Sequence, residues 1–116
     1  MPKATRFMTT FNKGDLVVAQ FPFAGSRLTK KRPALVLLDS GDADIVLARI
    51  TTQPHQTAHD VNLIHWQSCG LRAASVIRLH KIVTTEKAQV LRVLGSLHPI
   101  DHQNIPAALK QTFGNW

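Results

Sequence analysis

Two short segments hold an arginine and a threonine that could act together on a phosphodiester. Arg32 precedes Pro33 in KKRPALVLL, and Thr51 begins the TTQ of LARITTQ. If these runs pair across a turn at residues 39–42, Arg32 and Thr51 meet at the open end of a hairpin. A guanidinium donates two hydrogen bonds to phosphate oxygens, and a threonine hydroxyl adds a third. The same two residues would also suit a solvated strand-end charge and an ordinary β-forming side chain.

Metal-dependent hydrolysis is poorly supported by the histidines and carboxylates. His55 and His59 are four residues apart, but the spacing suits a metal only on a helix, and a strand is expected there. His98 and His102 share the spacing, with Pro99 between them arguing against a helix. The single glutamate and the aspartates, which fall mostly in turns or at strand ends, offer little for paired-carboxylate catalysis. We therefore expect no metal and no cofactor, and interpret the histidines as solvated.

The balance of charges indicates a polyanionic partner. The chain has 116 residues, with 14 Lys and Arg against 7 Asp and Glu, which gives a formal charge of +7. A positive excess on so small a chain suits nucleic acid or an acidic protein, although it also suits simple solubility. Cys69 is the only cysteine, so no intramolecular disulfide can form, and a small buried side chain is its expected role.

The chain is expected to form one cytoplasmic domain. No apolar run approaches the ~18 residues of a membrane span, and the first eleven residues lack the apolar centre of a signal peptide. We expect a short basic tail over residues 1–10 and a single domain over residues 11–116, with Met8 as an alternative start.

Short apolar runs between turn residues predict a mainly β domain. A basic loop is expected over residues 24–31, and a polar loop over 53–57. Residues 89–97 suit a strand, alone or after a short helical turn. The other expected strands are 14–21, 34–38, 44–51, 59–64 and 75–79, the last continuing at 82–84 past a bend.

The C-terminal tail predicts one helix. Ile105, Leu109 and Phe113 recur at a spacing of four, which gives one apolar stripe. Pro106 suits the first turn and Asn104 the cap. Many short strands and one terminal helix predict a small β-barrel with a C-terminal helix.

The order of five motifs resembles the PemK/MazF family of toxins over residues 11 to about 113. These motifs are GDLVVAQFPF, KKRPALVLL, LARITTQ, GLRAASVIRLHKIVT and VLGSL. The resemblance implies an SH3-like, PemK-like barrel that forms a homodimer. It also implies the toxin of a type II toxin–antitoxin module, a metal-independent endoribonuclease that cleaves single-stranded RNA, often mRNA, at selected sequences. A cognate acidic antitoxin would inhibit it.

The resemblance also assigns residues. Arg32 and Thr51 match the catalytic pair, Gln53 a site-shaping residue that contacts RNA, and Ser75 a serine near the site. Gln20 and His80 depart from the family, because many members carry acidic residues there. The full set of residues expected to bind RNA is Arg27, Lys30, Lys31, Gln53, Arg72, Ser75, Arg78, His80 and Lys81.

Two other functions stay open on the sequence. A toxin of the same fold could bind a protein target such as DNA gyrase, which would not require the Arg32 and Thr51 pair. An inactive member could keep only RNA or antitoxin binding.

Overall fold

The computed structural model describes residues 9–22 and 27–116. Most of the expected basic tail, including Met8, lies outside the described residues, as do residues 24–26 of the expected loop. The described strands form one antiparallel sheet in the order β4-β5-β3-β2-β1-β6. Their bounds are β1 (Asp15–Pro22), β2 (Thr29–Asp39), β3 (Asp44–Thr51), β4 (Asp60–Asn62), β5 (Val76–Glu86) and β6 (Val90–Ser96).

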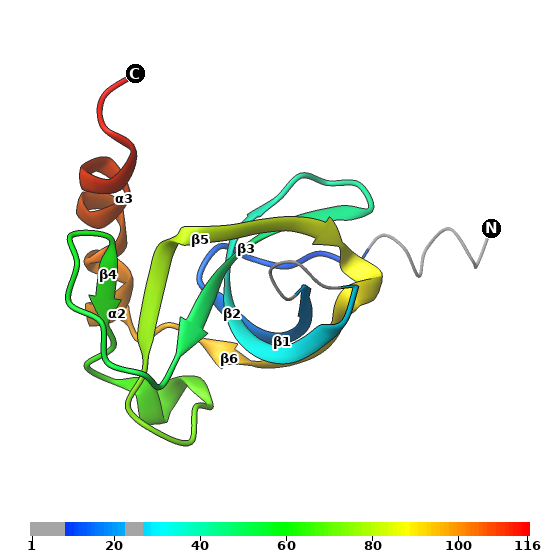
Figure 1. The fold of residues 1–116 in the computed structure, drawn as a ribbon, viewed down its shortest axis with the longest axis horizontal. Coiled ribbons are helices and arrows are strands. Elements are labelled where there is room, and N and C mark those ends of the chain that lie inside the picture. Colours follow the sequence, from blue (N-terminus) through cyan, green and yellow to red (C-terminus); the bar gives the residue numbers. More distant parts are fainter. Residues whose placement is uncertain (1–8, 23–26) are drawn as a thin grey trace.

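Short helical segments complete the described chain. They are the 3₁₀ turns η1 (Trp66–Cys69) and η2 (Lys87–Gln89) and the helices α2 (Pro99–Gln103) and α3 (Ile105–Phe113). The sheet curls round on itself, and α3 stands beside β4 and β5 at the C-terminal end of the molecule (Figure 1). The predicted mainly β class with a C-terminal helix is confirmed. No helix within the described ranges is long and apolar enough to cross a membrane.

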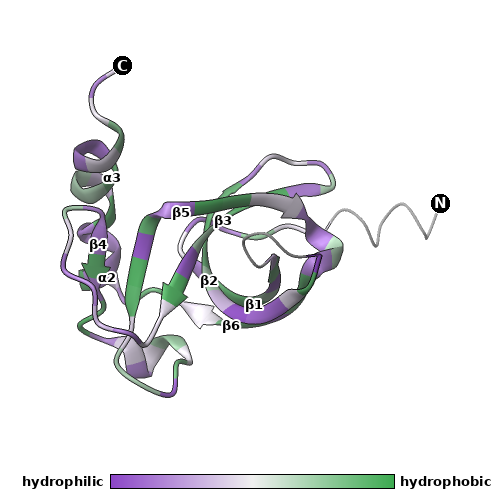
Figure 2. Cartoon of the chain, viewed as in Figure 1, coloured by the Kyte–Doolittle hydropathy of each residue, from purple (hydrophilic) through white to green (hydrophobic). Residues whose placement is uncertain are grey.

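Both faces of the curled sheet bury apolar side chains, because neighbouring strand residues point to opposite faces. Leu16 belongs to the cluster that α3 covers through Ala108 and Leu109, whereas Val17 belongs to the cluster inside the curl. Consecutive apolar residues such as 34–38 and 45–48 accordingly form long stretches of the central strands, with polar residues before and after them (Figure 2). Burial on both faces explains why these runs lack simple alternation in the sequence.

The predicted bend between residues 79 and 82 is present as a bulge in β5. Ala48 of β3 pairs with Ile82, but the next residue, Arg49, pairs with Arg78. The additional residues of β5 turn the strand sharply (Figure 1). The bulge thereby sets Arg78 directly opposite Arg49, next to the end of β3.

The β1–β2 hairpin extends further than the sequence predicts. Residues 29–31 were expected in a basic loop, but β2 begins at Thr29, which pairs with Pro22. The Thr29 hydroxyl also donates to the Gln20 side-chain oxygen at 2.9 Å. Cross-strand pairing with β1 therefore outweighs the loop-like composition of these residues, and the two strands remain paired as far as Pro22 and Thr29.

The C-terminal helix α3 is confirmed, with Pro106 in its first turn. Asn104 is the N-cap residue of α3, as predicted, but its side chain makes no capping hydrogen bond. The argument that Pro99 prevents a helix was wrong, because Pro99 begins α2, where a proline loses no hydrogen bond. His98 caps α2 by accepting the Ile100 amide hydrogen at 3.1 Å.

A buried carboxylate fastens α2 to the segment after β4. Asp101 is fully buried and accepts the backbone N–H groups of Ile64 and His65, each at 2.8 Å. Two hydrogen bonds to one ionisable group satisfy it inside the protein. The segment that leads to η1 is therefore fixed.

Close backbone contact joins η1 to β6. Gly70 has a φ of +85°, and a Cβ there would collide with the Leu94 backbone. A Cβ at Gly95 would meet the Cys69 backbone at 3.0 Å. Cys69 is fully buried, and burial raises the pKa of its thiol, in keeping with the small packed side chain that the sequence predicts.

Candidate functional site

The first half of β2, the last residues of β3 and the segment after β3 enclose a hollow of about 240 Å³. The β2–β3 ladder includes the pair Ala34 and Arg49, so its extension by two residues brings Arg32 and Thr51 to the same open end. The predicted meeting of these two residues is therefore present. The hollow is lined by Arg32, Pro33, Arg49, Ile50, Thr51, Thr52 and Gln53.

Local hydrogen bonding orients the Thr51 hydroxyl. Its Oγ1 accepts the backbone N–H of Gln53 at 3.2 Å. The hydroxyl hydrogen can then donate to a ligand in the hollow. Thr52, which is exposed, lies at the rim of the same hollow. The short turn after β3 thus brings Gln53 beside Thr51 and gives the hollow two neutral polar side chains.

Arg49 is the site residue that the sequence reasoning missed. It lies two residues before Thr51, so both side chains leave the same face of β3, while Ile50 between them enters the core. The Arg49 Nε atom is buried and has no hydrogen-bond partner within the described part of the chain. The strand alternation in LARITTQ was the signal that could have identified it.

Arg78 faces Arg49 but is held by an acidic partner. Its Nε lies 2.9 Å from Oδ1 of Asp60, whose side chain is fully buried. The remaining guanidinium nitrogens lie 3.4 Å from Nε2 of His55 and 3.5 Å from Nε2 of His80. Arg78 is therefore part of a network beside the hollow and does not line it.

Asp60 stays ionised to low pH. Burial acts to raise its pKa, but side-chain and backbone hydrogen bonds from Thr57 and the Arg78 guanidinium outweigh burial and hold the pKa at about 2. The charge on Asp60 consequently neutralises Arg78 over the whole physiological range.

His80 is exposed, and its ring centre lies 5.2 Å from that of His59. Partial desolvation and then the positive charge of Arg78 lower the pKa of His80 below its ordinary value of 6.5. A neutral His80 adds no positive charge near neutral pH. Among the residues described, no three His, Cys, Asp or Glu side chains converge as metal ligands would.

A second hollow of about 430 Å³ adjoins the first, since Pro33 and Thr52 line both. Apolar residues of β1, β6 and the segment after η1 form much of its wall, and Arg72 and Arg92 also line it. Ser75 lies in this wall, is nearly buried, and donates its hydroxyl hydrogen to the Ala73 carbonyl at 2.8 Å. Ser75 is therefore in the second hollow, apart from Arg32.

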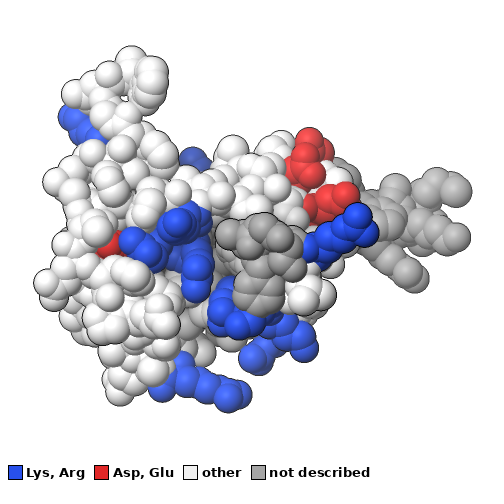
Figure 3. All heavy atoms as spheres, in the orientation of Figure 1, with Lys and Arg blue, Asp and Glu red and all other residues white. Residues whose placement is uncertain are grey.

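The remaining basic candidates lie outside both hollows. Arg27, Lys30, Lys31 and Lys81 are exposed and line neither one. Lys and Arg side chains gather across the face seen in Figure 3, over β3, β5 and the β1–β2 side, while most visible acidic atoms lie together toward one end of the molecule. This face is therefore suited to a polyanion.

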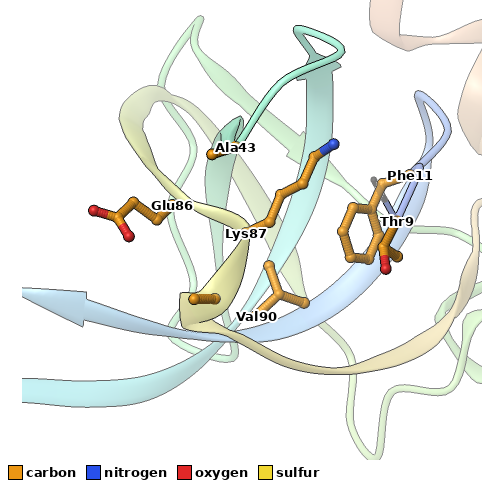
Figure 4. Close-up of a pocket in the computed structure, with 7 residues that line it drawn as sticks. Thr9, Phe11, Ala43, Glu86, Lys87 and Val90 are labelled. Atoms are coloured by element: carbon orange, nitrogen blue, oxygen red, sulfur yellow. The ribbon is translucent and has the colours of Figure 1, made fainter. Parts of the chain in front are cut away.

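A pocket of about 340 Å³ at another end of the sheet differs in character. Lys87 and Phe11 line it, and Glu86 points away from them (Figure 4). The Lys87 ammonium lies 2.9 Å from Oδ1 of Asp39, so its charge is already neutralised. This pocket lacks the uncompensated positive charge of the hollow that Arg32 and Arg49 line.

Comparisons with known proteins bear on this arrangement. A family model for the PemK-like, MazF-like toxin of type II toxin–antitoxin systems matches residues 12–113. No curated protein sequence matches the chain significantly.

Three solved structures share its fold. An endoribonuclease from a mycobacterial species, in complex with its cognate antitoxin, is 20% identical with a TM-score of 0.76, covering 92% of this chain and 99% of that chain. The Mycobacterium tuberculosis toxin MazF-mt6 is 22% identical with a TM-score of 0.74, covering 88% and 99%. A further mycobacterial endoribonuclease is 22% identical with a TM-score of 0.75, covering 95% and 98%.

Proposed function

The chain belongs to the PemK-like, MazF-like toxin family of type II toxin–antitoxin systems, and from this premise we propose that it is a metal-independent endoribonuclease. Its substrate in this proposal is single-stranded RNA, such as mRNA, which it cleaves at selected sequences in the cytoplasm. The observation that carries the proposal is the hollow in which Arg32, Thr51 and Gln53 lie together. These side chains offer hydrogen-bond donors to a phosphodiester, and no acidic residue is among those lining the hollow.

The reaction proposed is an attack by RNA on itself. The 2′ oxygen bonds to the adjacent phosphorus while the bond from phosphorus to the 5′ oxygen breaks. One proton leaves the 2′-hydroxyl and one joins the departing oxygen, which yields a 2′,3′-cyclic phosphate and a 5′-hydroxyl. Arg32 stabilises the charge that grows on the nonbridging oxygens, and Thr51 donates a further hydrogen bond. Because the nucleophile belongs to the substrate, the mechanism needs no metal-activated water.

The partners proposed are a second copy of the chain and an acidic antitoxin. One related endoribonuclease was solved with its cognate antitoxin. The formal charge of +7 on each protomer favours an acidic, partly disordered segment lying over the basic face. Light scattering at micromolar concentration tests the homodimer, and competition between single-stranded RNA and the neighbouring gene's product tests the shared surface. A monomer, or simultaneous undiminished binding, would contradict these assignments.

Cleavage in the presence of excess chelator is the decisive test of the enzymatic proposal. Purified protein should cut a long single-stranded RNA, and mapping of the ends should reveal both the cyclic phosphate and the preferred sequence. The matched control is Arg32→Ala, which excludes a contaminating nuclease. Activity that is lost in chelator and restored by magnesium would contradict the mechanism. Binding without any cleavage would support an inactive member of the family.

A further inference from the structure

The hollow holds a guanidinium group for which the proposed reaction has no role. The Arg49 Nε atom is buried without a hydrogen-bond partner in the described chain. Arg49 lies on the same face of β3 as Thr51 and lines the same hollow as Arg32. Resting on the proposed function, we propose that Arg49 binds a backbone phosphate of the RNA that flanks the scissile phosphate, and so positions the strand.

The charges around Arg49 favour an external anion. The neighbouring Arg78 has its own carboxylate at 2.9 Å, and that carboxylate also accepts hydrogen bonds from Thr57. The described residues that line the hollow include Arg32 and Arg49 but no aspartate or glutamate. Arg49 makes no ion pair with any described carboxylate, so its guanidinium charge stays uncompensated until a ligand supplies negative charge. An RNA phosphate has the required charge and oxygens.

The strand register indicates that Arg32 and Arg49 bind two different phosphates. Arg49 pairs with Ala34, whereas Arg32 lies two residues further along β2, so the two arginines occupy diagonal positions. Diagonal partners in an antiparallel pair lie about 7–8 Å apart, with their Cβ atoms somewhat closer. Each guanidinium fork matches the oxygens of a single phosphate. Two guanidinium groups whose side chains start at this separation suit consecutive phosphates of the RNA. Arg32 then binds the reacting phosphate.

The adjoining hollow offers the RNA strand a path away from Arg49. Pro33 and Thr52 are shared by the two hollows, so a chain that leaves Arg49 and Thr51 can pass over them toward Arg72 and Arg92. Arg49 then holds the strand at one side of the reacting bond. It is a positioning residue in this proposal, because it contacts a phosphate at which no bond changes.

A chemical double-mutant cycle tests the proposal directly. The probe is an oligonucleotide with 2′-O-methyl sugars that spans the mapped cut site, so that it binds without being cleaved. Each phosphate in turn is replaced by a neutral methylphosphonate. With the wild-type protein, neutralising the flanking phosphate should weaken binding about tenfold or more, as expected for a charge-assisted pair. With Arg49→Ala the same replacement should leave the affinity almost unchanged, while methylphosphonates at the other positions should weaken binding as they do for the wild type.

The control variants separate this contact from a structural role. Arg72→Ala, in the adjoining hollow, should keep the full effect of the flanking methylphosphonate. Arg49→Lys keeps the positive charge but loses the two parallel donors of the guanidinium. The flanking methylphosphonate should therefore weaken its binding more than it weakens that of Arg49→Ala, but less than that of the wild type. In cleavage, Arg49→Ala should raise KM about tenfold with little change in kcat, unlike a variant of the reacting pair. If Arg49→Ala does not fold, Arg49→Gln takes its place in the cycle.

Several outcomes would overturn the assignment. If every methylphosphonate lowers the affinity of the wild type and of Arg49→Ala equally, Arg49 contacts no phosphate. Coupling of Arg49 to the scissile phosphate would place it in the reacting pair. If the wild-type protein cuts no RNA, the proposed enzymatic function fails, and the same cycle on a 2′-O-methyl uridine homopolymer still decides whether Arg49 binds a phosphate.

Discussion

Arg49 of β3 and Arg78 of β5 lie directly opposite each other in the sheet, but their charges are compensated differently. Arg78 is ion-paired with Asp60 at 2.9 Å, whereas the Nε of Arg49 has no hydrogen-bond partner in the described residues. Two guanidinium groups at one cross-strand pair repel each other, and the carboxylate of Asp60 reduces this repulsion. The bulge in β5 creates the pair, so it also determines where positive charge remains available.

Acid should weaken the fold through Asp60. Its pKa is lowered from 3.8 to about 2 in the folded chain, so its contribution is fully present above pH 3.8 and is lost as the pH falls through about 2. Asp60→Asn should lower the free energy of unfolding at pH 7 by about 3 kcal/mol, because it leaves Arg78 without its acidic partner. Urea unfolding at pH 7 and pH 3 measures both effects.

Asp60→Asn should also lose less free energy of unfolding than the wild type between pH 7 and pH 3. Some dependence will persist, because Asp39 also has its pKa held at about 2, chiefly by the hydrogen bond from Lys87. An identical pH dependence in the two proteins would show that Asp60 is not the titrating group.

Arg32→Ala should reduce RNA cleavage by about 10²–10³-fold, the usual cost of losing one donor to a developing oxyanion. The fold should be unaffected, because Arg32 is only partly buried within β2. Single-turnover cleavage measures the loss, and thermal unfolding checks the fold. Lys31→Ala is the matched control, and it should change the rate only a few-fold. Near wild-type cleavage by folded Arg32→Ala would remove Arg32 from the mechanism.

Thr51→Ala should damage cleavage severely, and Thr52→Ala much less. The Thr51 hydroxyl is oriented by the backbone N–H of Gln53, whereas Thr52 is exposed at the rim. Thr51→Ser keeps the hydroxyl and should retain most activity. Rates for the three variants on one RNA substrate provide the comparison, and greater sensitivity at Thr52 would mean that the other hydroxyl faces the scissile bond.

RNA binding should weaken with salt, because basic side chains that contact phosphates release counterions. Removing one contact to a single strand should make the slope of log affinity against log salt shallower by about 0.7. We expect this change for Lys31→Ala, since Lys31 lies in β2 beside Arg32. Lys110→Ala, on α3, serves as the control of equal charge and should leave the slope unchanged. Equal slopes for all three proteins would place Lys31 outside the interface.

Gly70→Ala should destabilise the protein by about 2–3 kcal/mol. It combines a positive φ of +85° with a collision against the Leu94 backbone. Gly41→Ala is matched to it, because its φ is +86° but no atom lies within 4 Å of an added Cβ. The difference between the two losses in chemical unfolding isolates the contact between η1 and β6. Equal losses would show that the backbone conformation alone is responsible.

Apolar runs and turn residues were sufficient to predict most strands and helix α3, because these signals are local. The meeting of Arg32 and Thr51 was also predictable, since a hairpin aligns its two ends. The start of β2 was not predictable, because pairing with β1 converts a polar, basic segment into a strand. The sequence does not predict helix α2, because a proline interrupts a helix in most positions, whereas Pro99 stands at the start of α2.

Other features of the site depend on distant parts of the chain. The unpartnered Nε of Arg49 reflects the bulge in β5, which the sequence indicates only as a bend. The pairing of Arg78 with Asp60 joins residues of β4 and β5 that no short motif connects. The burial of Ser75 in the adjoining hollow likewise follows from how the segment after η1 packs against β6.

The position of β1 between β2 and β6 has a consequence for how the protein is made. β2 is the next strand in the sequence after β1, but the other neighbour of β1 is formed by residues 90–96. A ribosome adds roughly 5–20 residues per second, so β1 waits several seconds for this second partner. Arg92 and Leu94, which line the adjoining hollow, arrive with β6. The nascent chain therefore cannot complete this surface until residues 90–96 have been synthesised, long after β1 itself.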